Sequence, residues 1–183
     1  MGKCTTVGVQ IDTATAANAT NAALAAEIKT LANDIRLKLK GSFNISLPLL
    51  AIGTTPANVE NVAFDYTVAG IRYTKAAVAA GTAPGNDVVP VDTYGAVAFD
   101  IDAAGTITVA EAADNVTGYA SAALAVADIP ALAATKSRMG TVSVIRATAG
   151  AFTFGTTSLA DGDTTVVYTD GQTSGEAIGA AVA

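Results

Sequence analysis

The sequence predicts a mainly β protein of the α+β class, with an N-terminal helix followed by an antiparallel β-sandwich or barrel of jelly-roll-like form. Two observations support this fold class. Residues 13–40 are rich in alanine and contain neither glycine nor proline, a composition that favours a helix. From residue 42 onward, β-branched and aromatic residues come in short runs separated by Gly, Asp, Asn and Pro, which is typical of short antiparallel strands and their turns.

The same change of composition divides the 183 residues into three expected parts. Residues 1–41 form an arm and an amphipathic helix for oligomerisation or docking, and Gly41 suits the cap that ends the helix. Residues 42–170 form one β-rich domain. Residues 171–183 are small and nearly uncharged, and we expect either a flexible tail or an arm that becomes ordered on a neighbouring chain.

The predicted helix has one apolar stripe, which is our candidate oligomerisation surface. Leu24, Ile28, Leu31 and Ile35 are spaced by four, three and four residues, like the a and d positions of a heptad. Roughly two to three heptads are too few to hold a coiled coil by themselves. The stripe therefore either joins chains or packs on the chain's own sheet, and the sequence leaves both open. Ile at a and Leu at d favour a dimer on peptide rules.

Short strands are expected throughout the β-rich part. Their predicted ranges are 44–50, 62–68, 71–75, 88–91, 95–101, 106–109, 141–147, 151–153 and 164–169. Hairpin turns are expected at Ala69-Gly70 and at Ala149-Gly150, because strand-forming runs flank each pair. One short helix is expected at residues 120–127, before Pro130.

Charge and hydropathy narrow the classes of partner. Charged residues make up 14% of the chain, which is sparse for the surface of a monomer, so we expect much of the surface to meet protein. The net charge is −6, and the one basic cluster, Arg36, Lys38 and Lys40, lies where cations offset the dipole of the predicted helix. We therefore expect no nucleic-acid partner. No signal peptide is evident and no apolar run is long enough to span a membrane, so no membrane partner is expected.

The first residues match a lipidation pattern. Residues 1–6 fit the short signal for N-myristoylation, and Cys4 sits where a second acyl chain could attach. The pattern is degenerate and no polybasic segment follows it, so we expect no lipid anchor. Cys4 is also the only cysteine, which excludes an internal disulfide.

The chain has few residues suited to catalysis. Histidine is absent, so the usual general base near neutral pH is missing and no Ser-His-Asp or Cys-His arrangement can be built. Paired carboxylates remain, as Asp100 with Asp102 and Asp161 with Asp163. Carboxylates in turns are far more often turn formers than acid–base pairs. We therefore expect a protein that is not an enzyme and that binds no cofactor.

One stretch imitates a calcium-binding loop. Asp100, Asp102, Gly105 and Glu111 fall at positions 1, 3, 6 and 12 of an EF-hand. Position 5 is Ala104, which offers no side-chain oxygen, and the flanking residues are typical of strands rather than helices. We interpret the stretch as a decoy and predict no metal site: a hairpin in which Asp102 opens the turn and Gly105 takes a positive φ angle.

Five stretches share the order and texture of a known group of proteins. They are FDYTVAGIRYTKAA (64–77), YGAVAFD (94–100), GYASAALAVADIP (118–130), MGTVSV (139–144) and GAFTFGTTSL (150–159). In these stretches the chain resembles the virion structural proteins of tailed bacteriophages, of the head decoration, cement or head-fibre type. The resemblance spans rather more than half of the chain.

The resemblance implies a virion component without catalytic residues. Its partners would be other copies of itself and the major capsid protein. Such proteins are commonly trimers, so dimer and trimer both stay open. An acidic chain is repelled by packaged DNA, so a position outside the capsid suits it better than one inside. Two alternatives are a fibre or tail component that contacts the host surface, and a glycan-binding module, which would stack sugars on exposed aromatic rings.

Overall fold

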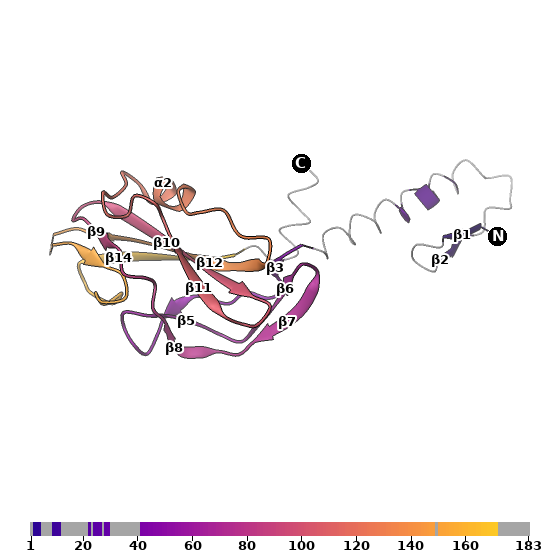
Figure 1. Cartoon of the computed structure of the whole chain (residues 1–183), viewed down its shortest axis with the longest axis horizontal. Helices are drawn as coiled ribbons and strands as arrows, with labels where there is room; N and C mark the ends of the chain where they lie inside the picture. The colour runs from indigo at the N-terminus through magenta and orange to yellow at the C-terminus, as the bar shows by residue number, and fades with distance from the viewer. Residues whose placement is uncertain are drawn as a thin grey trace.

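The computed structural model describes residues 2–4, 9–11, 22, 24–26, 28–29, 41–148 and 150–171. The strands and the helix in chain order are β1 Gly2–Cys4, β2 Val9–Ile11, β3 Phe43–Asn44, β4 Ala51–Ile52, β5 Val59–Asn61, β6 Phe64–Val68, β7 Ile71–Lys75, β8 Val78–Thr82, β9 Val88–Val89, β10 Tyr94–Asp102, β11 Ile107–Glu111, α2 Ala122–Ala127, β12 Lys136–Arg146, β13 Phe152–Thr153 and β14 Thr164–Asp170. Every described strand pair is antiparallel. The prediction of a mainly β, antiparallel fold is confirmed (Figure 1).

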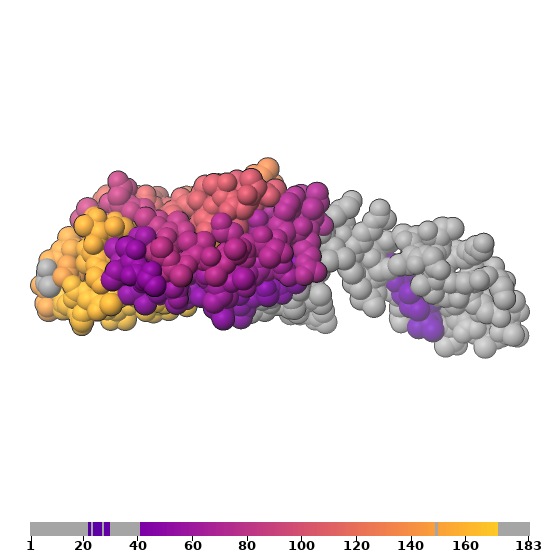
Figure 2. Space-filling view, turned by 90° about the horizontal axis from the view of Figure 1, so that it is seen from below, coloured from indigo at the N-terminus to yellow at the C-terminus, as the bar shows by residue number. Residues whose placement is uncertain are grey.

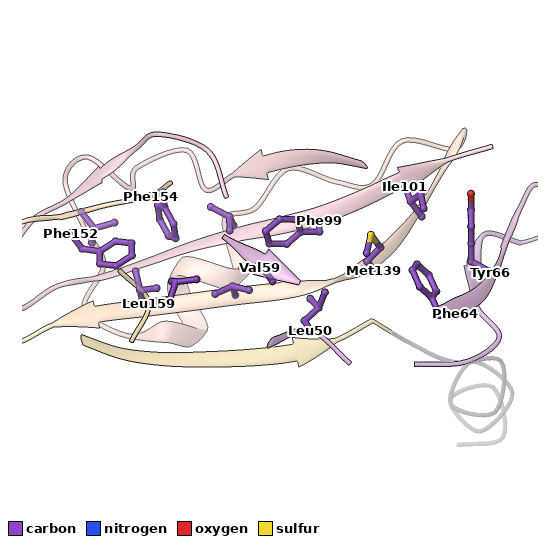
Figure 3. Close-up of a cluster of buried hydrophobic side chains, with 14 of the residues drawn as sticks. Leu50, Val59, Phe64, Tyr66, Phe99, Ile101, Met139, Phe152, Phe154 and Leu159 are labelled. Carbon is purple, nitrogen blue, oxygen red and sulfur yellow. The ribbon is translucent and has the colours of Figure 1, made fainter. Parts of the chain in front are cut away.

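Two layers of strands enclose the main core, as in a β-sandwich. One layer is the four-stranded sheet β11-β10-β12-β14, called the main sheet below. The other layer consists of two three-stranded sheets, β3-β6-β7 and β4-β5-β8. The buried cluster between them draws side chains from both layers (Figure 3). It contains Leu50, Val59, Phe64, Tyr66, Val68, Val89, Val97, Phe99, Ile101, Met139, Val142, Val144, Phe152, Phe154 and Leu159.

The main sheet is covered on both faces at its central strand β10, and the alternation of side chains along this strand explains how. Successive side chains of a strand point to opposite faces. On β10, Val97, Phe99 and Ile101 face the main core, whereas Ala96 and Ala98 face the other way. The second face packs against α2, which buries a small cluster of Ala96, Ala98, Ala112, Ala125 and Ile129. Because both faces are covered, β10 is buried along almost its whole length.

A β-bulge interrupts the pairing of β10 with β12. Phe99 pairs with Gly140 and Asp100 pairs with Arg138, so Met139 is an extra residue on β12. The bulge shifts the register, and it lets both Met139 and the neighbouring valines of β12 reach the main core.

The side chain of Asn44 binds the backbone at this bulge, and Gly140 lets the neighbouring strand approach it. The side-chain amide of Asn44 donates hydrogen bonds to the carbonyl oxygens of Arg138 and Met139, at 3.1 and 3.3 Å. At Gly140, an added Cβ would lie 2.4 Å from the carbonyl oxygen of Thr169 on β14. The strands therefore approach closely here because the residue is glycine.

Several predicted elements are confirmed. β6 and β7 form the expected hairpin, and Ala69 and Gly70 have φ angles of 50° and 80°. The short helix also forms, as α2, and the Ser121 side chain accepts a hydrogen bond from the backbone N–H of Leu124 at its start.

Other predictions are wrong in instructive ways. The predicted strand 44–50 is reduced to β3, because Pro48 has no N–H to donate and Leu49 adopts a φ of 47°. The predicted hairpin at Ala149-Gly150 does not form between β12 and β13: β12 pairs with β10 and β14, and β13 pairs with β9 instead. Both edges of β12 are already occupied, so a third strand has no place beside it.

The N-terminal region is described only in part. β1 and β2 pair as a short antiparallel unit that the sequence analysis did not predict. Within the predicted helix, residues 22, 24–26 and 28–29 are helical. Leu31 and Ile35 of the predicted stripe lie outside the described residues.

Candidate assembly surface

Asp100, the first carboxylate of the calcium-like stretch, is paired with an arginine inside the protein. Asp100 is on the face of the main sheet that α2 covers, and its carboxylate accepts a hydrogen bond from Nε of Arg138 at 2.9 Å. The Asp100 side chain is only 8% exposed. Arg138 also donates to the carbonyl oxygen of Pro130, at 3.0 Å. The pair therefore ties the segment after α2 to the sheet.

The other two carboxylates of the stretch bind backbone N–H groups, Asp102 in a turn and Glu111 in the loop before β9. Oδ1 of Asp102 accepts hydrogen bonds from the N–H groups of Ala104 and Thr106, at 2.8 and 2.9 Å. Gly105 has a φ of 79°, so the predicted hairpin is confirmed. Oε1 of Glu111 accepts hydrogen bonds from the N–H groups of residues 86 and 87, at 2.9 and 3.1 Å. Asp100, Asp102 and Glu111 thus have three separate structural tasks.

The second carboxylate pair belongs to a partly buried network around Arg146. Asp161 accepts a hydrogen bond from the Arg146 guanidinium at 2.9 Å, and Asp163 lies 3.8 Å from its Nε. Asp163 also accepts from the hydroxyl of Thr148, at 2.8 Å. These bonds fasten the loop after β12 to the start of β14. Across the described ranges, no group of three or more acidic or cysteine side chains gathers as a metal site requires.

A pocket of about 330 Å³ opens beside the first half of β12 and the end of β14. Its lining includes Leu132, Thr141, Arg138 and Asp170. Both charged groups are already engaged: Arg138 holds Asp100, and Asp170 accepts a hydrogen bond from the N–H of Leu50 at 2.9 Å. What the pocket offers a partner is therefore mostly apolar and hydroxyl surface.

The helix α2 is held against the rest of the protein by its buried face and by a hydrogen bond at its C-terminal end. The buried residue of the helix, Ala125, packs on the alanines of the main sheet. Asp128 caps the C-terminal end of the helix, and its carboxylate accepts a hydrogen bond from the hydroxyl of Tyr119. The same hydroxyl accepts a hydrogen bond from the N–H of Asp114 at 2.8 Å. Burial, and next the bond to Asp128, raise the pKa of Tyr119 above its usual value.

The opposite side of α2 faces solvent and is apolar. Leu124 is 55% exposed and Val126 is 36% exposed. From Ala122 to Thr135, Asp128 is the only charged residue in the sequence, and it is bonded to Tyr119. We call the exposed side chains of residues 122–135 the α2 face. The helix was predicted from the sequence but this surface was not, although the nearly uncharged run from 118 to 135 is a signal that indicates it.

A second exposed apolar group lies on the segment before β4. Ile45, Leu47 and Leu49 are exposed there, and Val62 lies beside them because its N–H donates to the carbonyl oxygen of Pro48 at 2.9 Å. The positive φ of Leu49 lets its side chain point to solvent while the next residue enters the main core. The segment between β3 and β5 is drawn in purple (Figure 1), and purple atoms lie on the face of the domain that Figure 2 shows from below.

The predicted oligomerisation stripe is only partly described. Leu24 is helical and half exposed, and Ile28 is helical and partly buried. An exposed leucine at a d position is available to a second chain.

No family model, curated protein or solved structure matches the chain. In the described parts of the chain, no helix is both long and apolar enough to cross a membrane. The surfaces above are therefore interpreted from their own chemistry. Exposed apolar groups with few charges are the composition of protein interfaces rather than of freely solvated surface.

Proposed function

We propose that the chain is a non-enzymatic structural protein that assembles with copies of itself on the outside of a bacteriophage head, where it decorates or cements the capsid. The α2 face is the observation that supports this proposal most directly. It is exposed, apolar and nearly uncharged, and it is held rigidly by the Asp100–Arg138 pair and by Tyr119. A rigid apolar face loses little conformational entropy when a partner covers it.

The use of the acidic side chains supports a structural role. Asp100 and Asp161 pair with arginines of the same chain, and Asp102 and Glu111 accept bonds from backbone N–H groups. Each carboxylate that the sequence offered for chemistry stabilises a turn or a strand connection instead. The place of assembly, the phage head, and the major capsid protein as partner follow from the resemblance of the five stretches between residues 64 and 159.

Virions made with and without this chain test the proposal. We expect many copies in each purified particle, and we expect capsids that lack the chain to open at a lower temperature. Absence of the chain from purified virions, or unchanged particle stability after deletion of its gene, would overturn the proposal. A low copy number together with loss of adsorption would instead place the chain in a fibre or tail that contacts the host.

A matched pair of variants tests the α2 face itself. Leu124→Asp places a charge on the face, so we expect fewer copies to bind to capsids that lack the chain. Val88→Asp, at another exposed apolar position, is the control and should bind normally. Equal binding of both variants would exclude the α2 face as the contact.

The glycan-binding alternative finds no supporting observation. All five Phe and all five Tyr residues lie in the described ranges, and each is buried or partly buried. Stacking on a sugar ring needs an exposed aromatic face. We expect a glycan array to give no signal.

A further inference from the structure

The main sheet ends in an edge strand without the usual protection. β14 is last in the order β11-β10-β12-β14, and within the described residues it has a paired strand on one side only. Natural edge strands are commonly guarded by lysine, proline, a bulge or a short length. β14 is seven residues long, reads TTVVYTD, and pairs with β12 in one unbroken register.

The single charged residue of β14 does not guard the edge. Asp170 turns toward its own chain, where its carboxylate accepts the N–H of Leu50 at 2.9 Å. On the outward-facing side of the strand, Thr165, Val167 and Thr169 are exposed, and Val167 is 51% exposed. By contrast, β11 at the other edge ends in Glu111, whose carboxylate holds the backbone of residues 86 and 87.

The hydrogen-bonding pattern shows which backbone groups of β14 are free. In the register of β12 with β14, the backbone N–H of Ala147 bonds to the carbonyl of Asp163, and the N–H of Gly171 bonds to the carbonyl of Met139. Because hydrogen-bonded pairs alternate in an antiparallel ladder, the odd-numbered residues of β14 bond to β12. The N–H and C=O groups of Val166 and Tyr168 therefore point away from β12, toward the open edge.

We propose that β14 pairs with β14 of a second copy of this chain, antiparallel and centred on Val167, so that two main sheets join into one continuous sheet. This proposal deepens the assembling role proposed above and rests on it. A strand of seven residues overlaps fully with its two-fold mate only when the central residue, Val167, faces itself. In that register the free groups of Val166 meet those of Tyr168 of the second copy, as a hydrogen-bonded pair requires.

The side chains are compatible with the same register. Val167 meets Val167, and Thr165 meets Thr169, which are favourable cross-strand pairs. Asp170 meets Thr164, so no like charges face each other across the join. The charge pattern of β14 is thus self-complementary.

Cysteine crosslinking tests both the pairing and its register. In a Cys4→Ser background, Val167→Cys should form a disulfide-linked dimer under mild oxidation, because directly opposed residues of an antiparallel pair have suitable spacing. Thr165→Cys alone should stay monomeric on a non-reducing gel, whereas an equal mixture of Thr165→Cys and Thr169→Cys chains should crosslink. Val116→Cys, at an exposed position away from the edge, is the control and should not crosslink.

The outcomes separate this proposal from the assembling role. If light scattering shows the chain to be oligomeric but Val167→Cys forms no crosslink, the β14 pairing is overturned and the assembling role stands. In that case another occupant, such as residues 172–183 or a different protein, covers β14. Crosslinking of Val167 and Val116 to equal extents would also overturn it, because random collision would then suffice. A chain that is monomeric at all concentrations would overturn both proposals.

Discussion

At the scale of single residues, buried polar side chains join segments of the chain that lie far apart in the sequence. Asp100 and Arg138 sit opposite each other where β10 and β12 pair, and their bond reaches the segment after α2 through the carbonyl of Pro130. Asn115 is wholly buried, and its amide bonds both to the N–H and to the carbonyl of Ala96, at 2.9 and 3.0 Å. It continues the pairing of β10 beyond the end of β11.

Removal of one partner of the Asp100–Arg138 pair should be costly. We expect Asp100→Asn to lower the free energy of unfolding by about 2–4 kcal/mol, because the largely buried guanidinium loses its counter-ion. Urea denaturation followed by circular dichroism measures the change. Asp114→Asn is the control, since Asp114 is exposed, and it should stay within about 0.5 kcal/mol of the parent. Equal effects of the two substitutions would contradict a structural role for the pair.

Asp65 gives a prediction about pH. The hydroxyl of Thr74, and next the guanidinium of Arg72, hold the pKa of Asp65 below its usual value of 3.8. Because the pKa is lower in the folded state, ionised Asp65 stabilises the fold above pH 3.8, and this contribution is lost as the pH falls through the folded pKa. We expect Thr74→Val to raise the pKa of Asp65 in a carboxyl NMR titration, and Thr74→Ser, which keeps the hydroxyl, to leave it low. An unchanged titration in Thr74→Val would contradict the assigned cause.

At the scale of elements, strands with a strong local pattern could be predicted and strands set by distant partners could not. β6 and β7 contain β-branched and aromatic residues around an Ala-Gly turn, and their pairing is local. β4, β5 and β8 are short or rich in small residues, and they are strands because they pair with one another. The failed hairpin after β12 has the same cause, since distant β10 and β14 already occupy its edges.

At the candidate surface, too, features set by local sequence could be predicted and features set by distant contacts could not. The sequence predicted that Asp102 and Gly105 form a turn, because that chemistry is local. It did not predict that α2 would bury only Ala125 and expose its larger side chains, because this depends on how close the helix lies to the sheet. The alanines beneath it, Ala96 and Ala98, set that distance.

The approach of α2 to the sheet can be tested by overfilling it. Ala98 is wholly buried beneath the helix, so Ala98→Leu should force α2 outward and lower the free energy of unfolding by about 1–3 kcal/mol. Amide hydrogen exchange of residues 122–127 should then be faster than in the parent protein, and the exchange of the main sheet should change less. Ala79→Leu, at an exposed position of β8, is the control and should change neither quantity. Unaltered exchange in Ala98→Leu would mean that the helix tolerates a wider spacing.

At the scale of the whole molecule, two separate proposed contacts are combined in one chain. The proposed β14 pairing joins two copies about a two-fold axis, and we propose that the helical stripe of the N-terminal segment joins two or three copies. A subunit with two separate self-association contacts builds assemblies larger than either contact alone allows. Such cross-connection suits a protein that covers a large curved surface.

This combination predicts how the oligomer should come apart. Val167→Lys should leave only the oligomer that the stripe forms, and Leu24→Ser with Ile28→Ser should leave only the β14 dimer. The three substitutions together should give a monomer of 18.1 kDa in light scattering. Ala22→Ser, at an exposed helical position outside the stripe, should leave the parent assembly unchanged. If Leu24→Ser with Ile28→Ser lowers thermal stability but leaves the assembly mass unchanged, the stripe packs within its own chain, and the contacts between copies lie in the β domain alone.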